Sequence, residues 1–248
     1  MCRVCVQRFL LLVLCGVCVL SGVIVLKVSG RLFNPYCGLS GRLIVEYSRL
    51  LSELYDSGFR IGVVVGGGEP ARRYISLARE VGASETLCDI IGVMVSRVNA
   101  QLLISAIGGR AYPHPPESLE EYLRAWSTGR IVVSGGFQPG QSTTTVSALV
   151  AEALNAKRLY IAASVDAVYD RDPKVYRNAR KLKEITLSEL KRIVVGDVKA
   201  GTYQLIDLHA ISILERSRIE VVLFDGGKPK LLLEAVKGGN PGTIIKPY

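Results

Sequence analysis

Histidine is almost missing from this chain of 248 residues, which has only His114 and His209. His114 lies in a proline-rich turn and His209 in a segment with helical spacing, so we expect both to be structural. A serine or cysteine nucleophile is usually activated by a neighbouring histidine. The shortage therefore argues against Ser-His-Asp and Cys-His catalytic sets.

The P-loop pattern G-x-x-x-x-G-K-[ST] is absent as well. The turn from Gly66 to Ala71 fits the dinucleotide pattern G-x-G-x-x-A, which also requires an acidic residue at the end of the next strand. The candidate, Asp89, instead follows one predicted helix and opens another. We therefore expect neither a P-loop NTPase nor an NAD-binding protein.

Cysteine is scarce in the body of the chain, because four of the six cysteines lie within the first 18 residues. The other two are single and far apart, which is typical of an intracellular protein without a disulfide framework. Cys2 with Cys5 and Cys15 with Cys18 have zinc-like spacing inside each pair, but the short segment between the pairs is mostly apolar. We predict no protein ligands for a metal.

The chain is basic, with 31 Lys and Arg, 22 Asp and Glu and a net charge of +9. This balance suits an anionic ligand but does not choose between a nucleotide, a nucleic acid and a membrane surface. The densest basic stretch, Arg177 to Lys183, contains no interleaved aromatic residues. We therefore expect it to be a solvated face and predict no nucleic-acid partner.

Strand and helix patterns alternate from Val23 onward. Short apolar runs are typical of strands buried on both faces, and helical spacing joins them, as over 87–107. This pattern predicts an α/β fold of three layers, with a mostly parallel central sheet and helices on both faces. Thr243–Ile245 is predicted as a final edge strand. The apolar runs are 61–65, 131–133, 159–163 and 219–224.

Two glycine-rich turns follow predicted strands, at 66–68 and at 135–140. Glycine allows the backbone to approach a ligand closely, and the hydroxyl-rich helix start at 142–144 offers N–H groups and a positive dipole end. An ordinary turn with Ser142 as N-cap is the alternative. Because ligands of such sheets sit beyond the carboxyl ends of the strands, the two turns together favour an anion-binding pocket.

Two charged residues are expected near these turns. Lys27 ends the first apolar strand, where a lysine is costly without an anionic partner, although it could extend to the sheet edge. Asp166 belongs to the acidic segment 165–173, which could also be a solvated turn. A lysine and a carboxylate over the strand ends would suit phosphoryl transfer, which depends on positioning and charge neutralisation.

In their order along the chain, these motifs resemble the amino acid kinase family. The resemblance covers about Val23 to Pro247, and Lys199–Gly201 and the helix at Asp207 fit it as well. It implies an amino acid kinase-like sandwich that transfers the γ-phosphoryl group of ATP to UMP, in pyrimidine nucleotide synthesis, with ATP and Mg²⁺ as cofactors. The motifs that carry it are 27–30, 65–68, 71–74, 135–143, 165–169 and 172–173.

The resemblance also implies roles for individual residues. Lys27 would neutralise the transferring phosphoryl group, and Asp166 would orient Lys27 or the metal-bound phosphates. Lys199 is a weaker candidate for a second phosphate contact. The residues expected along ATP are Gly30, Arg31, Gly68, Arg72, Ala163, Ser164, Tyr169 and Asp172. The residues expected to bind UMP are Gly67, Asp89, Phe137, Gln138, Pro139, Gly140, Gln141, Ser142 and Thr143.

The chain departs from the family at 163–169, where Ala-Ser-Val-Asp-Ala-Val-Tyr replaces the usual Thr-Asn-Val-Asp-Gly-Val-Tyr. Loss of the Thr hydroxyl and the Asn amide could weaken adenine or ribose contacts, and Ala167 stiffens the turn. We expect a change in nucleotide affinity and retention of the phosphoryl chemistry, because Lys27 and Asp166 remain.

Residues 1–20 form an apolar extension. Arg3 and Arg8 precede the apolar stretch from Phe9 to Leu20, as in a signal peptide or membrane anchor. A secreted product would place a nucleotide pocket where nucleotide is scarce. We therefore expect this extension to come from an over-extended gene model, and 21–248 to form a single domain.

Three alternatives stay open: another kinase of the family, acting on a carboxylate or an isoprenoid phosphate; a catalytically silent nucleotide- or oxyanion-binding protein; and a membrane-tethered nucleotide binder. The loop 138–143 favours a nucleoside phosphate, and retention of Lys27 and Asp166 argues against a silent protein. We predict a cytoplasmic enzyme with small-molecule nucleotides as partners, assembled as a homohexamer, and no membrane partner unless 1–20 is genuine.

Overall fold

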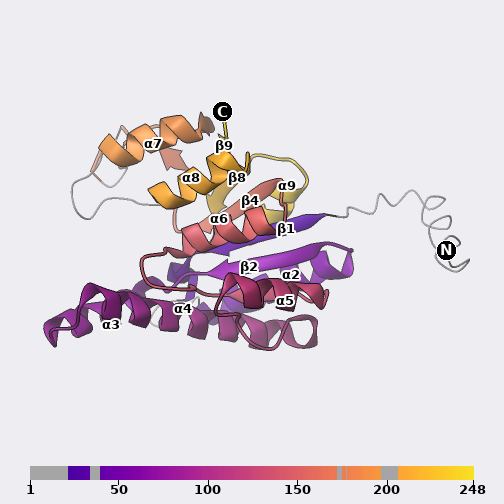
Figure 1. The fold of residues 1–248 in the computed structure, drawn as a ribbon. Helices are drawn as coiled ribbons and strands as arrows, with labels where there is room; N and C mark the ends of the chain where they lie inside the picture. Colours follow the sequence, from indigo (N-terminus) through magenta and orange to yellow (C-terminus); the bar gives the residue numbers. More distant parts are fainter. Residues whose placement is uncertain (1–21, 34–39, 172–174, 177, 197–205) are drawn as a thin grey trace, which may run out of the picture.

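The structure is a computed structural model that describes residues 22–33, 40–171, 175–176, 178–196 and 206–248. The predicted extension 1–20, Asp172 and Lys199 lie outside these residues. A seven-stranded sheet forms the centre of the molecule, with helices on both of its faces (Figure 1). The predicted three-layer α/β fold is therefore confirmed.

The first five strands of the sheet are parallel, and the sheet ends with two strands that run the opposite way. Thr243–Ile245 is not an edge strand as predicted, because β7 pairs with it on the outside. The strand order is β3 (Val132–Ser134), β2 (Arg60–Val65), β1 (Val23–Val28), β4 (Arg158–Ala163), β8 (Glu220–Asp225), β9 (Thr243–Lys246) and β7 (Glu184–Thr186). A separate hairpin joins β5 (Val168–Tyr169) and β6 (Lys181–Leu182).

The helices divide between the two faces of the sheet (Figure 1). One buried cluster lies under α2 (Ser40–Asp56), α4 (Glu85–Ile107) and α9 (Leu231–Val236). The other lies under α5 (Leu119–Ser127), α6 (Thr143–Ala153), α7 (Leu187–Gly196) and α8 (Leu208–Arg216). Helix α3 (Gly68–Glu80) packs against α4, and short 3-10 helices occupy Gly30–Phe33 and Gly108–Arg110.

The alternation of side chains along β1 determines which face of the sheet Lys27 lies on. Successive side chains of a strand face opposite sides of the sheet. Ile24, Leu26 and Val28 belong to the cluster under α2 and α4, and Val25 belongs to the cluster under α6 and α8. Lys27 follows the alternation of Val25, so it lies on the α6 and α8 side, at the carboxyl end of the strand.

The turns after β1 and β2 meet backbone to backbone. A Cβ atom on Gly30 would lie 2.2 Å from the nitrogen of Gly68 and 2.3 Å from the oxygen of Gly66. Gly68 has φ +69°, and a Cβ atom there would lie 2.1 Å from the oxygen of Gly30. Neither position has room for a side chain, and the two turns form one backbone surface.

We expect Gly30→Ala to lower the free energy of unfolding by roughly 3–5 kcal/mol, because its new methyl group meets backbone atoms that cannot move aside. Urea denaturation measures the loss. Gly41→Ala is the matched control, because a Cβ atom there has no neighbour within 4 Å. Equal stability of the two variants would contradict the close packing at Gly30.

Candidate active site

The loops at the carboxyl ends of the central strands are hydrogen-bonded to one another. Ser29 N donates to Ala162 O at 2.9 Å, and Gly66 N donates to Val28 O at 3.0 Å. The chain runs from β1 to β2 on one side and later returns to β4 on the other side of β1. Such a reversal of strand order is where ligands bind in open α/β sheets, so the predicted turns meet at the expected place.

Lys27 is the cation of this site. Burial lowers its pKa to about 8, and the carboxylate of Asp207 opposes that shift. Protonated Lys27 therefore lowers the stability of the folded protein. Such perturbed pKa values are frequent at functional sites, where an anionic ligand can stabilise the charge. Asp207 is the acidic residue that acts on Lys27.

Asp207 was missed as a site residue by the sequence interpretation, which noted only that its helix fits the family. It is the N-cap of α8 and accepts from Ala210 N at 3.0 Å and from the Thr145 hydroxyl at 2.7 Å. The Ser142 hydroxyl also donates to it. Burial acts to raise the pKa of Asp207, but these hydrogen bonds hold it below its usual range, so the carboxylate is ionised.

Asp166 occupies a different environment from the one predicted. Its carboxylate accepts from the Tyr169 hydroxyl at 2.9 Å and forms an ion pair with Lys181. Burial acts to raise its pKa, but Lys181 and Tyr169 hold it below the usual value. Asp207 is thus the carboxylate that acts on the pKa of Lys27, and the roles of Asp166 toward Lys27 or the metal-bound phosphates stay predictions. The described basic residues of that stretch, Arg180, Lys181 and Lys183, are exposed, as predicted.

Side chains of helix α4 form hydrogen bonds with the backbone of both glycine turns. The buried Asn99 amide donates to Gly66 O at 2.9 Å and to Gly67 O at 3.2 Å. The buried Ser96 hydroxyl accepts from Gly136 N at 2.8 Å. Sequence reasoning missed both side chains, although polar residues within an otherwise apolar helix need partners when buried and could have indicated them.

Most residues expected to bind UMP lie in or beside the second turn, whereas Gly67 lies in the first turn. Asp89 Oδ2 accepts from Gly140 N at 2.8 Å, so one end of α4 and the loop at 137–143 come together as predicted. Ser142 is the N-cap of α6, as the alternative interpretation had it, and accepts from the backbone N–H groups of Thr144 and Thr145. Its hydroxyl thus connects the start of α6 with Asp207.

The residues expected along ATP are more dispersed. Gly30 and Gly68 are in contact, and the exposed Arg31 follows Gly30 directly. Arg72 is exposed and pairs with Glu69 at 3.4 Å. The remaining described members of the set lie at the end of β4 and in the β5 hairpin, which is bonded to Asp166. These are Ala163, Ser164 and Tyr169.

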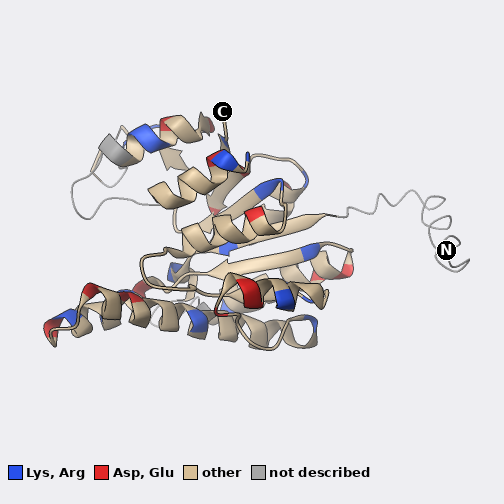
Figure 2. Cartoon of the chain, in the orientation of Figure 1, with Lys and Arg blue, Asp and Glu red and all other residues tan. Residues whose placement is uncertain are grey.

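Charge is not concentrated into a nucleic-acid-binding face on the side of the molecule that Figure 2 presents. Basic and acidic residues are interspersed along the helices of that view, and no continuous basic stripe crosses its coloured part. A stripe of that kind is the usual electrostatic footprint of nucleic-acid binding.

Comparison with known proteins agrees with the geometry. The sequence model of the amino acid kinase family matches residues 22–225. The chain is 49% identical over 222 residues to a uridylate kinase of Pyrobaculum calidifontis, covering 90% of this chain and 99% of that protein. It is 47% identical over 225 residues to a uridylate kinase of Hyperthermus butylicus, covering 91% of this chain and 98% of that protein.

Solved structures give the same result. The uridylate kinase of Archaeoglobus fulgidus superposes with a TM-score of 0.80 at 38% identity, over 90% of this chain and 99% of that one. A UMP kinase of Bacillus anthracis has a TM-score of 0.74 at 22% identity, over 92% of this chain and 96% of that one, which supports the fold alone.

We expect Lys27→Met to stabilise the protein by roughly 1–3 kcal/mol at pH 7, because the folded-state pKa lies below the ordinary value of 10.5 and the charged form is disfavoured by folding. In the wild type, the loss of stability caused by protonated Lys27 is greatest below about pH 8 and disappears as the pH rises to about 10.5. The gap between the two proteins should therefore shrink across that window. Equal stability in urea denaturation at pH 7 would contradict this account.

Proposed function

The chain belongs to the amino acid kinase family, and we propose that it transfers the γ-phosphoryl group of ATP to UMP, giving ADP and UDP. The observation that carries the proposal is the position of Lys27, which lies beside the joined glycine turns and under the influence of Asp207. The similarity to uridylate kinases over 90% of the chain supports UMP as the acceptor.

Lys27 would stabilise the negative charge of the transferring phosphoryl group. Asp207 favours the protonated lysine and is itself fixed by Ser142 and Thr145 at the start of α6. The cation is therefore linked to α6, which follows the acceptor loop, residues 135–142. Preorganised charge of this kind, together with positioning of the two substrates, supplies most of the catalysis of phosphoryl transfer.

Asp89 suits the ribose of the acceptor. One of its carboxylate oxygens, Oδ2, is bound to Gly140 N, which leaves Oδ1 to accept from a ribose hydroxyl group. In this arrangement Asp89 would hold the acceptor loop and the substrate at once. The other residues proposed for UMP are Gly67, Phe137, Gln138, Pro139, Gln141, Ser142 and Thr143.

Mg²⁺ would enter this site with ATP. In its usual protein sites Mg²⁺ keeps several waters and is held by one or two carboxylates together with substrate phosphates. The described residues include no group of three or more His, Cys, Asp or Glu that could hold a metal ion. Asp166 is the carboxylate that would face the ion, and the ion would neutralise negative charge on the phosphates.

A catalytically silent nucleotide-binding protein is the second candidate. The observation that favours it is the changed segment after β4, where Ala163 and Ser164 stand and Asp166 is paired with Lys181. Turnover with UMP separates the two candidates.

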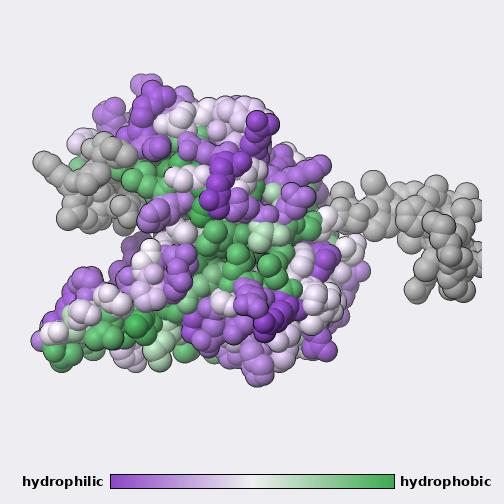
Figure 3. All heavy atoms as spheres, in the orientation of Figure 1, coloured by the Kyte–Doolittle hydropathy of each residue, from purple (hydrophilic) through white to green (hydrophobic). Residues whose placement is uncertain are grey.

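We also propose that the protein is a cytoplasmic homo-oligomer, with the hexamer as our expectation. Large apolar side chains are exposed along α3 and α4, and Figure 3 shows a hydrophobic surface where α3 lies in Figure 1. Contiguous patches of this kind mark interaction sites. The exposed side chains are Tyr74, Leu77, Val81, Leu87, Ile90, Met94, Val98 and Leu102.

Among the described residues, one helical stretch, Glu85–Arg110, is long and apolar enough to cross a membrane by length and composition. It contains Ser96 and Asn99, whose side chains hold the glycine turns. This stretch is therefore part of the active-site framework, and it supports no membrane partner.

The full-length protein should release ADP from Mg-ATP when UMP is supplied, and less with CMP, acetylglutamate or isopentenyl phosphate. Lys27→Ala should lower kcat by about 10²–10³, as for loss of a preorganised charge donor. A coupled ADP assay measures both. Wild-type turnover in the variant would remove Lys27 from the mechanism, and silence of the wild type with every acceptor would favour the binding protein.

A further inference from the structure

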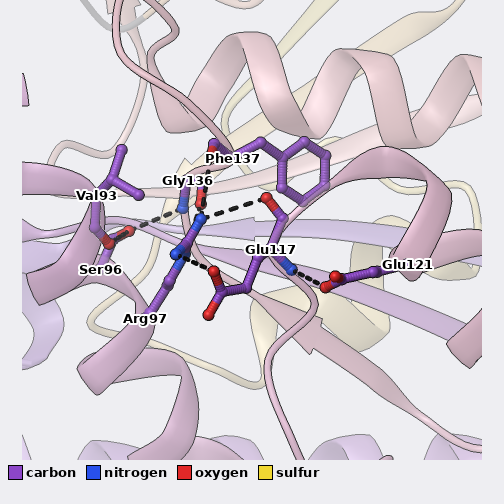
Figure 4. Close-up of polar contacts among 7 residues, drawn as sticks. All are labelled: Val93, Ser96, Arg97, Glu117, Glu121, Gly136 and Phe137. Carbon is purple, nitrogen blue, oxygen red and sulfur yellow. Dashed lines mark hydrogen bonds and ion pairs between the residues drawn. The ribbon is translucent and has the colours of Figure 1, made fainter. Parts of the chain in front are cut away.

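The acceptor loop is held by an arginine that neither the sequence motifs nor the proposed chemistry accounts for. The guanidinium of Arg97, on α4, donates to Gly136 O at 3.2 Å and to Phe137 O at 3.0 Å. It also forms an ion pair with Glu117 at 2.7 Å and donates to the backbone oxygen of Glu117 at 3.3 Å. Figure 4 shows the guanidinium between these two segments.

Arg97 is unusual among the ion-paired arginines of the described residues, because only 20% of its side chain is exposed. Surface ion pairs contribute little to the free energy of folding, whereas hydrogen bonds from a charged donor to backbone carbonyls in a half-buried site contribute more. The important contacts are therefore those with the loop, while Glu117 fixes the direction of the guanidinium.

Glu117 is itself fixed by the start of α5. Its backbone N–H donates to Glu121 Oε2 at 2.8 Å, and the N–H of Glu121 donates to the Ser118 hydroxyl at 3.1 Å. Arg97 thus connects three elements, namely α4, the start of α5 and the acceptor loop (Figure 4).

The two carbonyl contacts have a consequence for the opposite side of the loop. In a trans peptide the C=O and N–H groups of one peptide unit point in opposite directions, and no peptide bond in the described chain is cis. Because the carbonyls of Gly136 and Phe137 point to Arg97, the N–H groups of Phe137 and Gln138 point away from α4. Neither N–H has an acceptor among the described residues.

Further contacts hold the start of the loop against α4 and α5. Gly136 N is held by Ser96, and a Cβ atom at Gly135 would lie 2.5 Å from the Ser96 hydroxyl oxygen and 2.6 Å from Arg97 N. The Phe137 ring packs against Tyr122, with ring centroids 6.3 Å apart. The loop is therefore pressed against α4, and its two N–H groups without an acceptor among the described residues face away from that helix.

We propose that Arg97 is a positioning residue that turns the N–H groups of Phe137 and Gln138 toward oxygen atoms of the acceptor nucleotide. This inference rests on the proposed UMP kinase function, because it assigns the loop to UMP. Arg97 does not touch the substrate in this account, and it acts through the backbone of the loop.

The test is steady-state kinetics of the full chain at saturating Mg-ATP, with UMP varied and then with ATP varied. Arg97→Ala should raise KM for UMP by about 10–100-fold, as for loss of charge-assisted hydrogen bonds, with kcat and KM for ATP changed less than about threefold. Arg97→Lys should fall between the variant and the wild type, because a point charge cannot reach both carbonyls.

Arg110→Ala is the matched control, because Arg110 forms a similar ion pair with Asp56 at 2.8 Å, which joins the segment after α4 to the end of α2. It should leave both KM values unchanged. An unchanged KM for UMP in Arg97→Ala, or equal increases for UMP and ATP, would overturn the proposal. If Arg97→Ala does not fold, Arg97→Lys is judged by the same criterion.

Two further arms identify the contact and separate this inference from the proposed function. Greater loss with UMP than with CMP would indicate that the N–H groups meet the base, and equal loss would indicate the phosphate or ribose; either supports the positioning role. If the wild type does not turn over UMP, the proposed function fails, and calorimetric titration with UMP still compares wild type and Arg97→Ala. Equal UMP binding by the two, or no binding by the wild type, overturns the role of Arg97.

Discussion

The site depends on the electrostatic interaction between Lys27 and Asp207. The lysine stands in a strand whose other side chains are apolar, and burial alone would drive it toward the neutral form. Asp207 opposes this, and it can do so because three hydrogen bonds keep it ionised at the start of α8. The sheet, α6 and α8 must therefore all be in place before the cation is ready for a phosphate.

Helix α4 supplies the second constraint. Its side chains reach both glycine turns, through Asn99 on one and through Ser96 and Arg97 on the other. Since glycine turns have no side chains of their own to fix them, one rigid helix sets the distance between the predicted donor and acceptor pockets. The outer side of the same helix carries exposed apolar residues, so an assembly that covers them would also support the site.

The sequence was sufficient for the fold and for the residues whose signal is local. Buried strands, glycine turns and Lys27 each follow from a few neighbouring residues, and the structure brings them together. The partner of Lys27 could not be found this way, because Asp207 and Asp166 both follow predicted strands or start helices, and only the tertiary packing distinguishes them. The position of β9 was missed for a similar reason, since the short β7 gives a weak strand pattern.

The most direct test of the interaction is the pH dependence of kcat/KM for ATP, which reports ionisations of the free enzyme, in the wild type and in Asp207→Asn. The wild type should lose activity above about pH 8, as Lys27 deprotonates. Asp207→Asn should lose it at lower pH, because the charge that raises the pKa of Lys27 is gone. An identical profile in both proteins would contradict the coupling of Lys27 to Asp207.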